Sequence, residues 1–420
     1  MSTTTVHTEH GQVRVQQPTL TSHAREYLQR VRGGDIGSLP AILGLVVLCL
    51  FFGIVRPAFF TAGNFANLFT QGAAVTLIAM GLIFVLLLGE IDLSAGYASG
   101  VCASVLAVLL ADYGWSWWGA VLAALAAGTL IGLTIGLLVA KVGIPSFVVT
   151  LAAFLACQGV VLWLLEEGTN VSVQNEVIKA INNDRWVPPG IGWLLVGIAV
   201  GGYAVVQYLR RRSRAARGLV TDPLTVLAAR VGGLALITGI AVYVLNMERS
   251  RNPLVVSLKG MPIVVPIIGV LLIVLSFVLS RTAYGRHIYA VGGNKEAARR
   301  AGINVDRIRI SVFVIGSTMA AVGGIVAASR AASVDPRTGG SNVLLYAVGA
   351  AVIGGTSLFG GKGRVLDAVL GGALIAVIDN GMGLMGYSSG TKYVVTGLVL
   401  LGAATVDALS RRRAAARGLA

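Results

Sequence analysis

The feature that most constrains this chain is a series of apolar runs long enough to cross a lipid bilayer. A membrane-spanning helix needs roughly 20 mostly apolar residues to cross the hydrocarbon core. The clearest runs lie at residues 40–55, 72–89, 119–142, 147–165, 191–209, 263–280 and 365–378. Two glycine-rich stretches, at residues 94–111 and 345–355, are weaker candidates. We therefore expect an all-α polytopic membrane protein with about 10–12 transmembrane helices.

The composition supports the same class of protein. Only 12% of the 420 residues are charged and 55% are hydrophobic, whereas a soluble domain carries about 25% charged residues. Most of the chain therefore cannot face water. The sequence predicts a polar N-terminal tail over residues 1–38, a transmembrane domain over residues 39–410, and a basic C-terminal tail over residues 411–420. Some 38 polar residues precede the first apolar run, so the N-terminus does not resemble a cleavable signal peptide.

The net charge of +15 is distributed as in a membrane protein. A basic chain often binds nucleic acid, but these arginines lie in the tails and between apolar spans. With both termini in the cytoplasm, 24 of the 33 Lys and Arg residues fall inside and 9 outside, as the positive-inside rule requires. The opposite orientation would move the arginine-rich residues 210–217 across the membrane. We expect both termini to be cytoplasmic and no nucleic-acid partner.

No residue cluster in the sequence indicates covalent chemistry or a metal site. Cys49, Cys102 and Cys157 lie inside apolar spans without metal-ligand spacing, as buried small hydrophobic residues do. Three of the four histidines lie in the N-terminal tail, and His287 lies in a later loop. We expect no catalytic residue, no metal and no cofactor, so the chain is not expected to be an enzyme.

The long polar loop at residues 281–310 contains a well-marked short helix. Asn294 is a favourable N-cap, Glu296 suits the positive first turn, residues 297–301 are helix formers, and Gly302 supplies a C-terminal stop. A helix of this kind is a candidate for docking into a groove of a partner. The alternative is an amphipathic connector that lies on the membrane surface.

The segment GGTSLFGGKGR at residues 354–364 resembles a phosphate-binding loop but does not match one. A Walker A motif needs Gly five residues before its Gly-Lys pair and Ser or Thr after the Lys. This chain has Thr356 at the first position and Gly363 at the last. The glycines therefore favour helix breaking and close backbone approach at the membrane edge.

Four polar residues within or beside apolar spans are candidates to line a pathway. Ionisable residues within membrane spans are functional candidates because their burial is costly. Glu90 and Asp92 precede an apolar run, and the alternative is structural, with Asp92 capping the following helix. Asp379 and Asn380 lie deep in the penultimate run among several glycines, which suggests a helix end or a break that opens on a cavity.

The sequence also contains a faint internal repeat. Residues 90–96 and 354–361 are polar, small-residue breaks, and each is followed by a span that opens with an aromatic-Val-Val-Thr run, at residues 145–152 and 391–398. In the orientation above, both breaks face the cytoplasm, which predicts a parallel repeat of the kind found in transporters. Chance similarity between apolar helices is the alternative.

Several motifs together resemble one family. YGRHIYAVGGNKEAARRAGINV, GEIDLSAG, IPSFVVTLA, VIGGTSLFGGKG and IDNGM occur in order between residues 64 and 407. They are similar to those of the permeases of bacterial ABC importers for ribose, xylose and galactose. Within that class the chain is most similar to the D-xylose permeases, which share its length and an extra pair of spans, here residues 191–246.

The resemblance implies a permease that carries a monosaccharide, such as D-xylose, across the cytoplasmic (inner) membrane. Its implied partners are a second permease copy, cytoplasmic ATP-binding subunits and an extracytoplasmic sugar-binding protein, with the bilayer around it. The alternative is a secondary transporter driven by an ion gradient, whose signature is carboxylates deep in several spans; here only Asp379 comes near that.

The motifs and the polar residues within the spans together give the candidate residues. The residues expected to couple to the ATPase are Gly293, Asn294, Glu296, Ala297, Ala298, Arg299 and Gly302. The residues expected to line the pathway are Glu90, Asp92, Phe147, Asp379 and Asn380.

Overall fold

The computed structural model describes residues 8–9, 12–13, 37–166, 169–183, 185–219, 221, 223–250, 252 and 257–416. Most of the predicted N-terminal tail and residues 417–420 lie outside this description. The described chain divides into two units. Unit 1 comprises residues 1–36, 188–260 and 410–420, and unit 2 comprises residues 37–187 and 261–409.

The predicted all-α membrane fold is confirmed. Among the described residues, eight helices are long and apolar enough to cross a membrane. They are α3 (Ala62–Leu87), α5 (Trp117–Leu137) with its π-helical end η2 (Leu138–Val142), α6 (Ser146–Leu165), α8 (Pro189–Ala216), α9 (Leu224–Leu245), α10 (Val264–Arg281), α13 (Val305–Ala331) and α15 (Val365–Leu384). The shorter apolar helices are α2 (Leu39–Val55), α4 (Ala95–Ala111) and α14 (Ser341–Gly354), and the chain ends in α16 (Ser389–Ala416).

In unit 1, α8 and α9 pack against each other as a helical hairpin. They form the extra pair of spans that the sequence predicts at residues 191–246. The unit also contains the two-residue strands β1 (Thr8–Glu9) and β2 (Gln12–Val13), which pair antiparallel.

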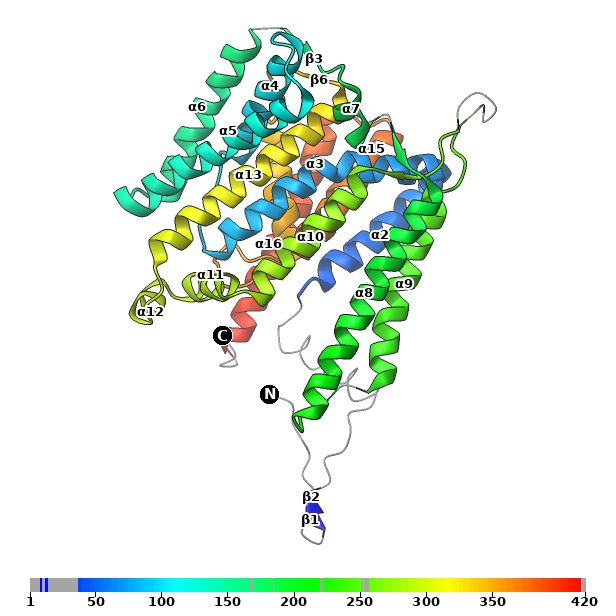
Figure 1. The fold of residues 1–420 in the computed structure, drawn as a ribbon, viewed down its shortest axis with the longest axis vertical. Coiled ribbons are helices and arrows are strands. Elements are labelled where there is room, and N and C mark those ends of the chain that lie inside the picture. Colours follow the sequence, from blue (N-terminus) through cyan, green and yellow to red (C-terminus); the bar gives the residue numbers. More distant parts are fainter. Residues whose placement is uncertain are drawn as a thin grey trace. The chain divides into compact units, whose positions relative to one another are not determined.

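In unit 2, α3 and α13 lie side by side at the centre of the bundle (Figure 1). Gly81 of α3 faces Gly316 of α13, and a Cβ atom on Gly81 would lie 2.9 Å from the Gly316 carbonyl oxygen. Small residues at such a contact let two membrane helices approach closely. Leu77, Phe84 and Phe313 are fully buried around this pair.

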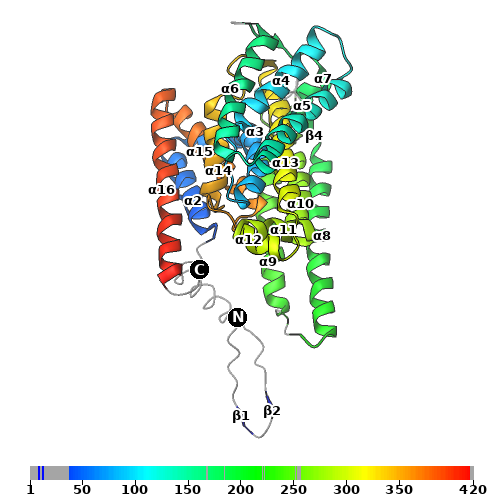
Figure 2. The same cartoon turned by 90° about the vertical axis from the view of Figure 1, so that its left-hand side faces the viewer.

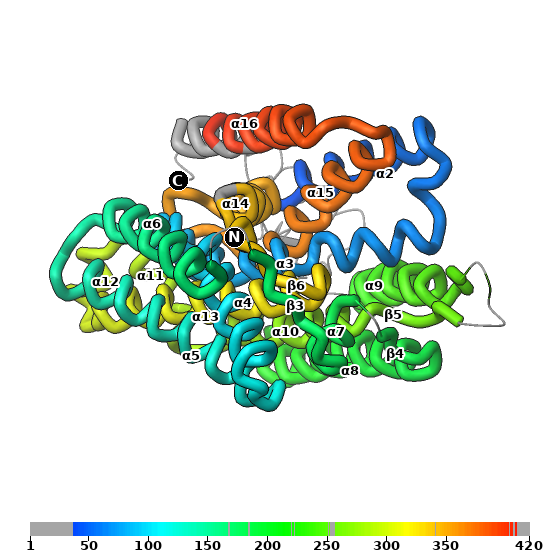
Figure 3. Tube along the Cα trace, turned by 90° about the horizontal axis from the view of Figure 1, so that it is seen from above, coloured from blue at the N-terminus to red at the C-terminus, as the bar shows by residue number. Residues whose placement is uncertain are grey.

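A stripe of glycines brings α5 onto the other side of α13. Gly128, Gly132 and Gly136 recur every four residues and therefore share one face of α5. A Cβ atom on Gly132 would lie 2.5 Å from the carbonyl oxygen of Phe313. In the view from above, α5 runs beside α13 (Figure 3).

The two ends of unit 2 carry different elements (Figure 2). The "α12 end" holds α11 (Ala283–Gly293), α12 (Lys295–Arg300), and the two breaks at residues 88–94 and 355–364. The "α7 end" holds η1 (Pro57–Phe60), α7 (Glu176–Asn182), the antiparallel strands β3 (Val171–Ser172) and β6 (Ser333–Val334), and the antiparallel strands β4 (Trp186–Val187) and β5 (Met261–Pro262).

The predicted parallel repeat is wrong. Both breaks do lie at the α12 end, but α6 begins at that end with Phe147 in its first turn, whereas α16 begins at the α7 end with Tyr393 in its first turns. The two aromatic-Val-Val-Thr runs therefore point in opposite directions. Similar short sequences occur in apolar helices that run in either direction, so the similarity of these two runs does not indicate a parallel repeat.

The packing instead relates two groups of helices that run in opposite directions. α3 packs on α13, α4 packs on α5 and α13, and correspondingly α14 packs on α15 and α3. The loop that follows the first helix of each group, α3 or α13, has the same local chemistry. Asp92 Oδ1 accepts from the Ser94 backbone N–H at 2.9 Å, and Asp335 Oδ1 accepts from the Arg337 backbone N–H at 2.9 Å. Unit 2 therefore contains an inverted arrangement around the α3–α13 pair.

Candidate functional site

The short helix predicted in the polar loop is confirmed as α12. The Asn294 side-chain oxygen accepts the Ala297 backbone N–H at 2.9 Å, which caps the helix. Gly302 has a φ of +81° and ends it, since a left-handed residue lets the chain turn away from a helix. The N-cap and the stop residue thus occupy the predicted positions.

One face of α12 is open and the other is closed. Lys295, Glu296, Ala297, Arg299 and Arg300 are exposed. Gly293 and Asn294, which precede the helix, and Gly302, which follows it, are also exposed.

The prediction that Ala298 is available to a partner is wrong. Ala298 is only 4% exposed and belongs to the same buried cluster as Val291, Val305 and Ile308. Successive residues on a helix are about 100° apart, because 3.6 residues complete a turn. The turn that exposes Ala297 therefore buries Ala298 against α11 and α13.

Two charged residues of α12 pair with each other. Arg299 Nη1 lies 2.7 Å from Glu296 Oε1, in an exposed i,i+3 pair. Such surface pairs contribute about 0–1 kcal/mol, so both groups remain available for exchange with a partner surface.

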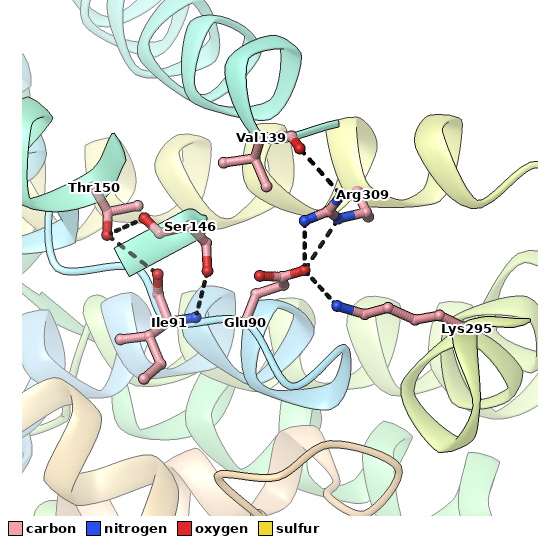
Figure 4. A network of polar contacts seen from close by, with 7 residues as sticks. All are labelled: Glu90, Ile91, Val139, Ser146, Thr150, Lys295 and Arg309. Carbon is pink, nitrogen blue, oxygen red and sulfur yellow. Dashed lines mark hydrogen bonds and ion pairs between the residues drawn. The ribbon is translucent and has the colours of Figure 1, made fainter. Parts of the chain in front are cut away.

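Glu90 is the centre of a buried ionic cluster that joins α12 to the bundle (Figure 4). The Glu90 side chain is 6% exposed, and its Oε1 atom lies 2.8 Å from Lys295 Nζ and 2.8 Å from Arg309 Nη2. Arg309 also donates from Nε to Glu90 Oε1 at 3.0 Å and from Nη1 to the Val139 carbonyl oxygen at 3.1 Å. One carboxylate thus contacts the first residue of α12 and the first turns of α13.

The environment keeps Glu90 ionised. Burial acts to raise the pKa of its carboxyl, but hydrogen bonds from Lys295 and Ser146 and the charges of Arg309 and Lys295 outweigh this effect. The pKa of Glu90 therefore lies below its ordinary value. Removing one partner of such a buried pair typically costs about 3–5 kcal/mol, because the other charge stays buried without compensation.

The remainder of the 88–94 break is bonded to α6 and α4. The Ile91 N–H donates to Ser146 Oγ at 3.5 Å, and the Ile91 carbonyl accepts from Thr150 Oγ1 at 3.2 Å. Asp92 is 1% exposed, and its Oδ1 accepts from the Ser94 backbone N–H and, at 2.6 Å, from the Ser94 hydroxyl. The Asp92 carboxylate therefore lies at the start of α4, in accord with the structural interpretation.

Backbone contacts hold the C-terminal end of α3 against α11. The Gly361 N–H donates to the Leu87 carbonyl oxygen at 2.9 Å. A Cβ atom on Gly292 of α11 would collide with the same carbonyl. Gly89, with a φ of +69°, then turns the chain out of α3. The contact of Gly361 matches the close backbone approach predicted for the glycines of residues 354–364.

The predicted pathway residues do not form one group. Glu90, Asp92 and Phe147 lie at the α12 end, and Phe147 is 53% exposed in the first turn of α6. Asp379 and Asn380 lie toward the α7 end, where Asn380 exchanges two hydrogen bonds with Asn64 of α3, at 2.9 Å and 2.8 Å. Asn64 and the end of α3 are separated by about 34 Å of helix, at 1.5 Å per residue.

Sequence reasoning missed the partners of Glu90. Lys295 and Arg309 entered only as loop charges, and they are 205 and 219 residues away from Glu90 along the chain. The available signal was the cost of burying Glu90 beside an apolar span, which required a cation but did not identify one.

The geometry defines a polytopic membrane protein with an attached polar helix that is linked to the bundle by a buried ionic cluster. Comparison with known proteins identifies the class. The chain belongs to the family described as branched-chain amino acid transport system / permease component, which it matches over residues 64–404.

Several curated permeases are similar over most of their length. The xylose transport system permease protein XylH of Escherichia coli (strain K12) is 35% identical over 373 residues, which cover 89% of this chain and 92% of that protein. The corresponding protein of Haemophilus influenzae (strain ATCC 51907 / DSM 11121 / KW20 / Rd) is 33% identical, covering 89% and 96%. The ribose import permease protein RbsC of Escherichia coli (strain K12) is 30% identical, covering 87% and 92%. No solved structure gives a significant match.

These similarities confirm the resemblance to the xylose and ribose permeases that the sequence motifs indicate. The chain is a transport permease of a multi-pass inner-membrane type and not an enzyme.

Proposed function

We propose that the chain is the membrane-spanning subunit of an ABC importer and that its substrate is D-xylose or a closely related monosaccharide. The observation that carries the proposal is the 35% identity to a xylose permease over 89% of this chain. The ribose permease is less similar but matches nearly the same length, so a pentose is the substrate class that both relatives support.

The exposed face of α12 is the proposed attachment site for a cytoplasmic ATP-binding subunit. Ala297 is small, and Glu296, Arg299 and Arg300 surround it with charges of both signs. A short helix with one buried and one open face suits insertion into a groove. The corrected position of Ala298 makes it a support for the helix from behind and not a contact.

The remaining partners follow from this assignment. With α12 in the cytoplasm, the α7 end faces outward and is available to an extracytoplasmic sugar-binding protein. A second copy of the chain completes the pore. The two ends of unit 2, at residues 37 and 409, are then cytoplasmic, and the positive-inside rule favours the same side for both tails.

Sugar uptake tests the substrate. The chain is expressed with its ATP-binding and sugar-binding subunits in a bacterium that lacks its own pentose importers, and uptake of radiolabelled D-xylose is measured. We expect uptake that unlabelled D-xylose abolishes and that ribose reduces less. Uptake that neither pentose reduces would refute the substrate assignment.

Two alanine-to-tryptophan variants test the attachment site. Ala297→Trp should block seating by overpacking, which costs about 1–3 kcal/mol at a close-packed contact and weakens copurification with the ATPase by about tenfold. Ala111→Trp is the matched control, since Ala111 is an exposed alanine at the other end of the bundle. Equal copurification of both variants would show that α12 is only a connector.

A further inference from the structure

The bonds of Glu90 connect the proposed ATPase attachment helix with the break between α3 and α4. Lys295 is the first residue of α12, and Glu90 belongs to the 88–94 segment. Besides Lys295, the residue of α12 that packs against the bundle is the buried Ala298. A displacement of α12 must therefore break or pull on the Lys295–Glu90 bond.

The two cations around Glu90 differ in freedom. The Arg309 side chain is 18% exposed and is also held by the Val139 carbonyl oxygen, so it stays with the bundle. The Lys295 side chain is 44% exposed and lies on the helix that faces the proposed partner. A flexible, half-exposed lysine can leave the carboxylate at low cost, whereas the buried arginine cannot.

Movement of Glu90 would reach two helices. The next residue, Ile91, is bonded through both backbone groups to Ser146 and Thr150 in the first turns of α6. Asp92 holds the start of α4 through Ser94. Leu87, three residues before Glu90, is held by the Gly361 N–H and by the close approach of Gly292. The segment therefore has a fixed point before Glu90 and two movable helix starts after it.

We propose that Glu90 is a positioning residue for transport: its exchangeable bond to Lys295 transmits movement of α12 to the starts of α4 and α6, with Arg309 as the permanent anchor. The inference rests on the proposed function, because it takes α12 to be the attachment site. The bond links ATP hydrolysis on the partner to the conformation of the α3–α4 break.

The test uses the assembled complex of permease, ATPase and sugar-binding protein in liposomes, with ATP hydrolysis and D-xylose uptake measured on the same vesicles. Lys295→Met removes the cation and leaves Glu90 paired with Arg309, so the fold should survive. We expect ATPase copurification within about twofold of wild type, and uptake per ATP reduced about tenfold, within the range of measured coupling between sites. Lys295→Arg should restore most of the coupling.

Lys141→Met is the matched control, since Lys141 is an exposed lysine at the same end with an ion pair to Asp306 at 3.0 Å. It should keep the wild-type ratio. Glu90→Gln should lower uptake per ATP at least as far as Lys295→Met, because it removes the bond to Lys295 and also the anchoring ion pair to Arg309.

Two outcomes would overturn the inference. If Lys295→Met transports with the wild-type ratio, the bond has no part in coupling. If it loses ATPase copurification in proportion to uptake, Lys295 is a docking contact only. Failure of the proposed function looks different, because the wild-type complex would then show no ATP-dependent pentose uptake at all.

Discussion

Lys392 Nζ lies 3.2 Å from Asp379 Oδ1, so the beginning of α16 is bonded to α15 near the α7 end. The Asp379 side chain is 43% exposed and that of Lys392 is 21% exposed. An ion pair this accessible within apolar helices implies water or protein beside it, since lipid would make its charges costly. This exposure is what the predicted place of Asp379 on a pathway requires, and that place stays a prediction.

Asp379→Asn should reduce pentose uptake more than it reduces assembly with the ATPase. Loss of one charge-assisted hydrogen bond corresponds to about 1.5 kcal/mol, or roughly tenfold in uptake rate. Uptake into vesicles is compared at equal permease levels. Glu176→Gln is the control, since Glu176 forms an exposed pair with Arg185 at the same end. Unchanged uptake by Asp379→Asn would leave Asp379 with a structural role only.

Gly132→Ala should destabilise the bundle. Its new methyl group would meet the Phe313 carbonyl oxygen and the backbone of Val314, and overpacking of this kind costs about 1–3 kcal/mol. At Gly159 of α6, no atom from elsewhere in the described chain lies within 4 Å of the place that a Cβ atom would occupy. Gly159→Ala should therefore be neutral or slightly stabilising. Thermal unfolding in detergent, followed by tryptophan fluorescence, distinguishes the two. Equal melting temperatures would contradict the α5–α13 packing.

The loop after α9 should lose its structure in acid. Glu248 accepts hydrogen bonds from the Ser250 backbone N–H, the Ser257 hydroxyl and the Leu258 backbone N–H, which lower the pKa of its carboxyl to about 2. Because the folded-state pKa is below the ordinary value of about 4.3, the stabilisation is present above pH 4.3 and is lost as pH falls toward 2.

Hydrogen exchange of the peptide covering residues 245–260 measures this loss. Protection at pH 5 should exceed protection at pH 2.5 after correction for the intrinsic exchange rate. Glu248→Gln should remove the difference. A pH-independent protection in the wild-type chain would show that the carboxylate does not hold the loop.

Cysteine labelling tests the proposed orientation. Ser213→Cys, near the end of α8, should be protected from an impermeant maleimide in intact cells, and Ser116→Cys, between α4 and α5, should react. Both serines are exposed, whereas the native Cys102 and Cys157 are buried. Labelling of Ser213→Cys but not of Ser116→Cys would show that the chain has the opposite orientation in the membrane.

Local signals in the sequence predicted α12 well. Its N-cap, its acidic first turn and its glycine stop are chemical properties of adjacent residues, and the structure places Asn294 and Gly302 in those roles. The buried face of the same helix was not predictable in this way. Which of two adjacent alanines turns inward depends on contacts with α11 and α13, and no pattern within six residues encodes them.

Apolar length predicted most of the spans, and the resemblance to the xylose permeases added the second helix of the α8–α9 pair, but neither predicted which helices pack together. The contacts of Glu90 and Asn380 cross more than 200 residues. A single sequence specifies that a buried carboxylate or amide needs a partner, whereas the fold decides which one. The inverted arrangement of α3–α4 and α13–α14 was not predicted for the same reason. It is visible in the packing of the helices and in two aspartate turns, and the apolar sequences of the two groups are not similar enough to indicate it.

The pairing of β4 with β5 has a consequence for the history of the gene. Val187 lies opposite Met261 and Trp186 opposite Pro262, so the polypeptide leaves and re-enters unit 2 at neighbouring points. Residues 188–260 thus have the geometry of an insertion. Their excision would leave two antiparallel ends that an Asn-Gly turn can join, so the pair of spans can be gained or lost without rearranging the bundle of unit 2.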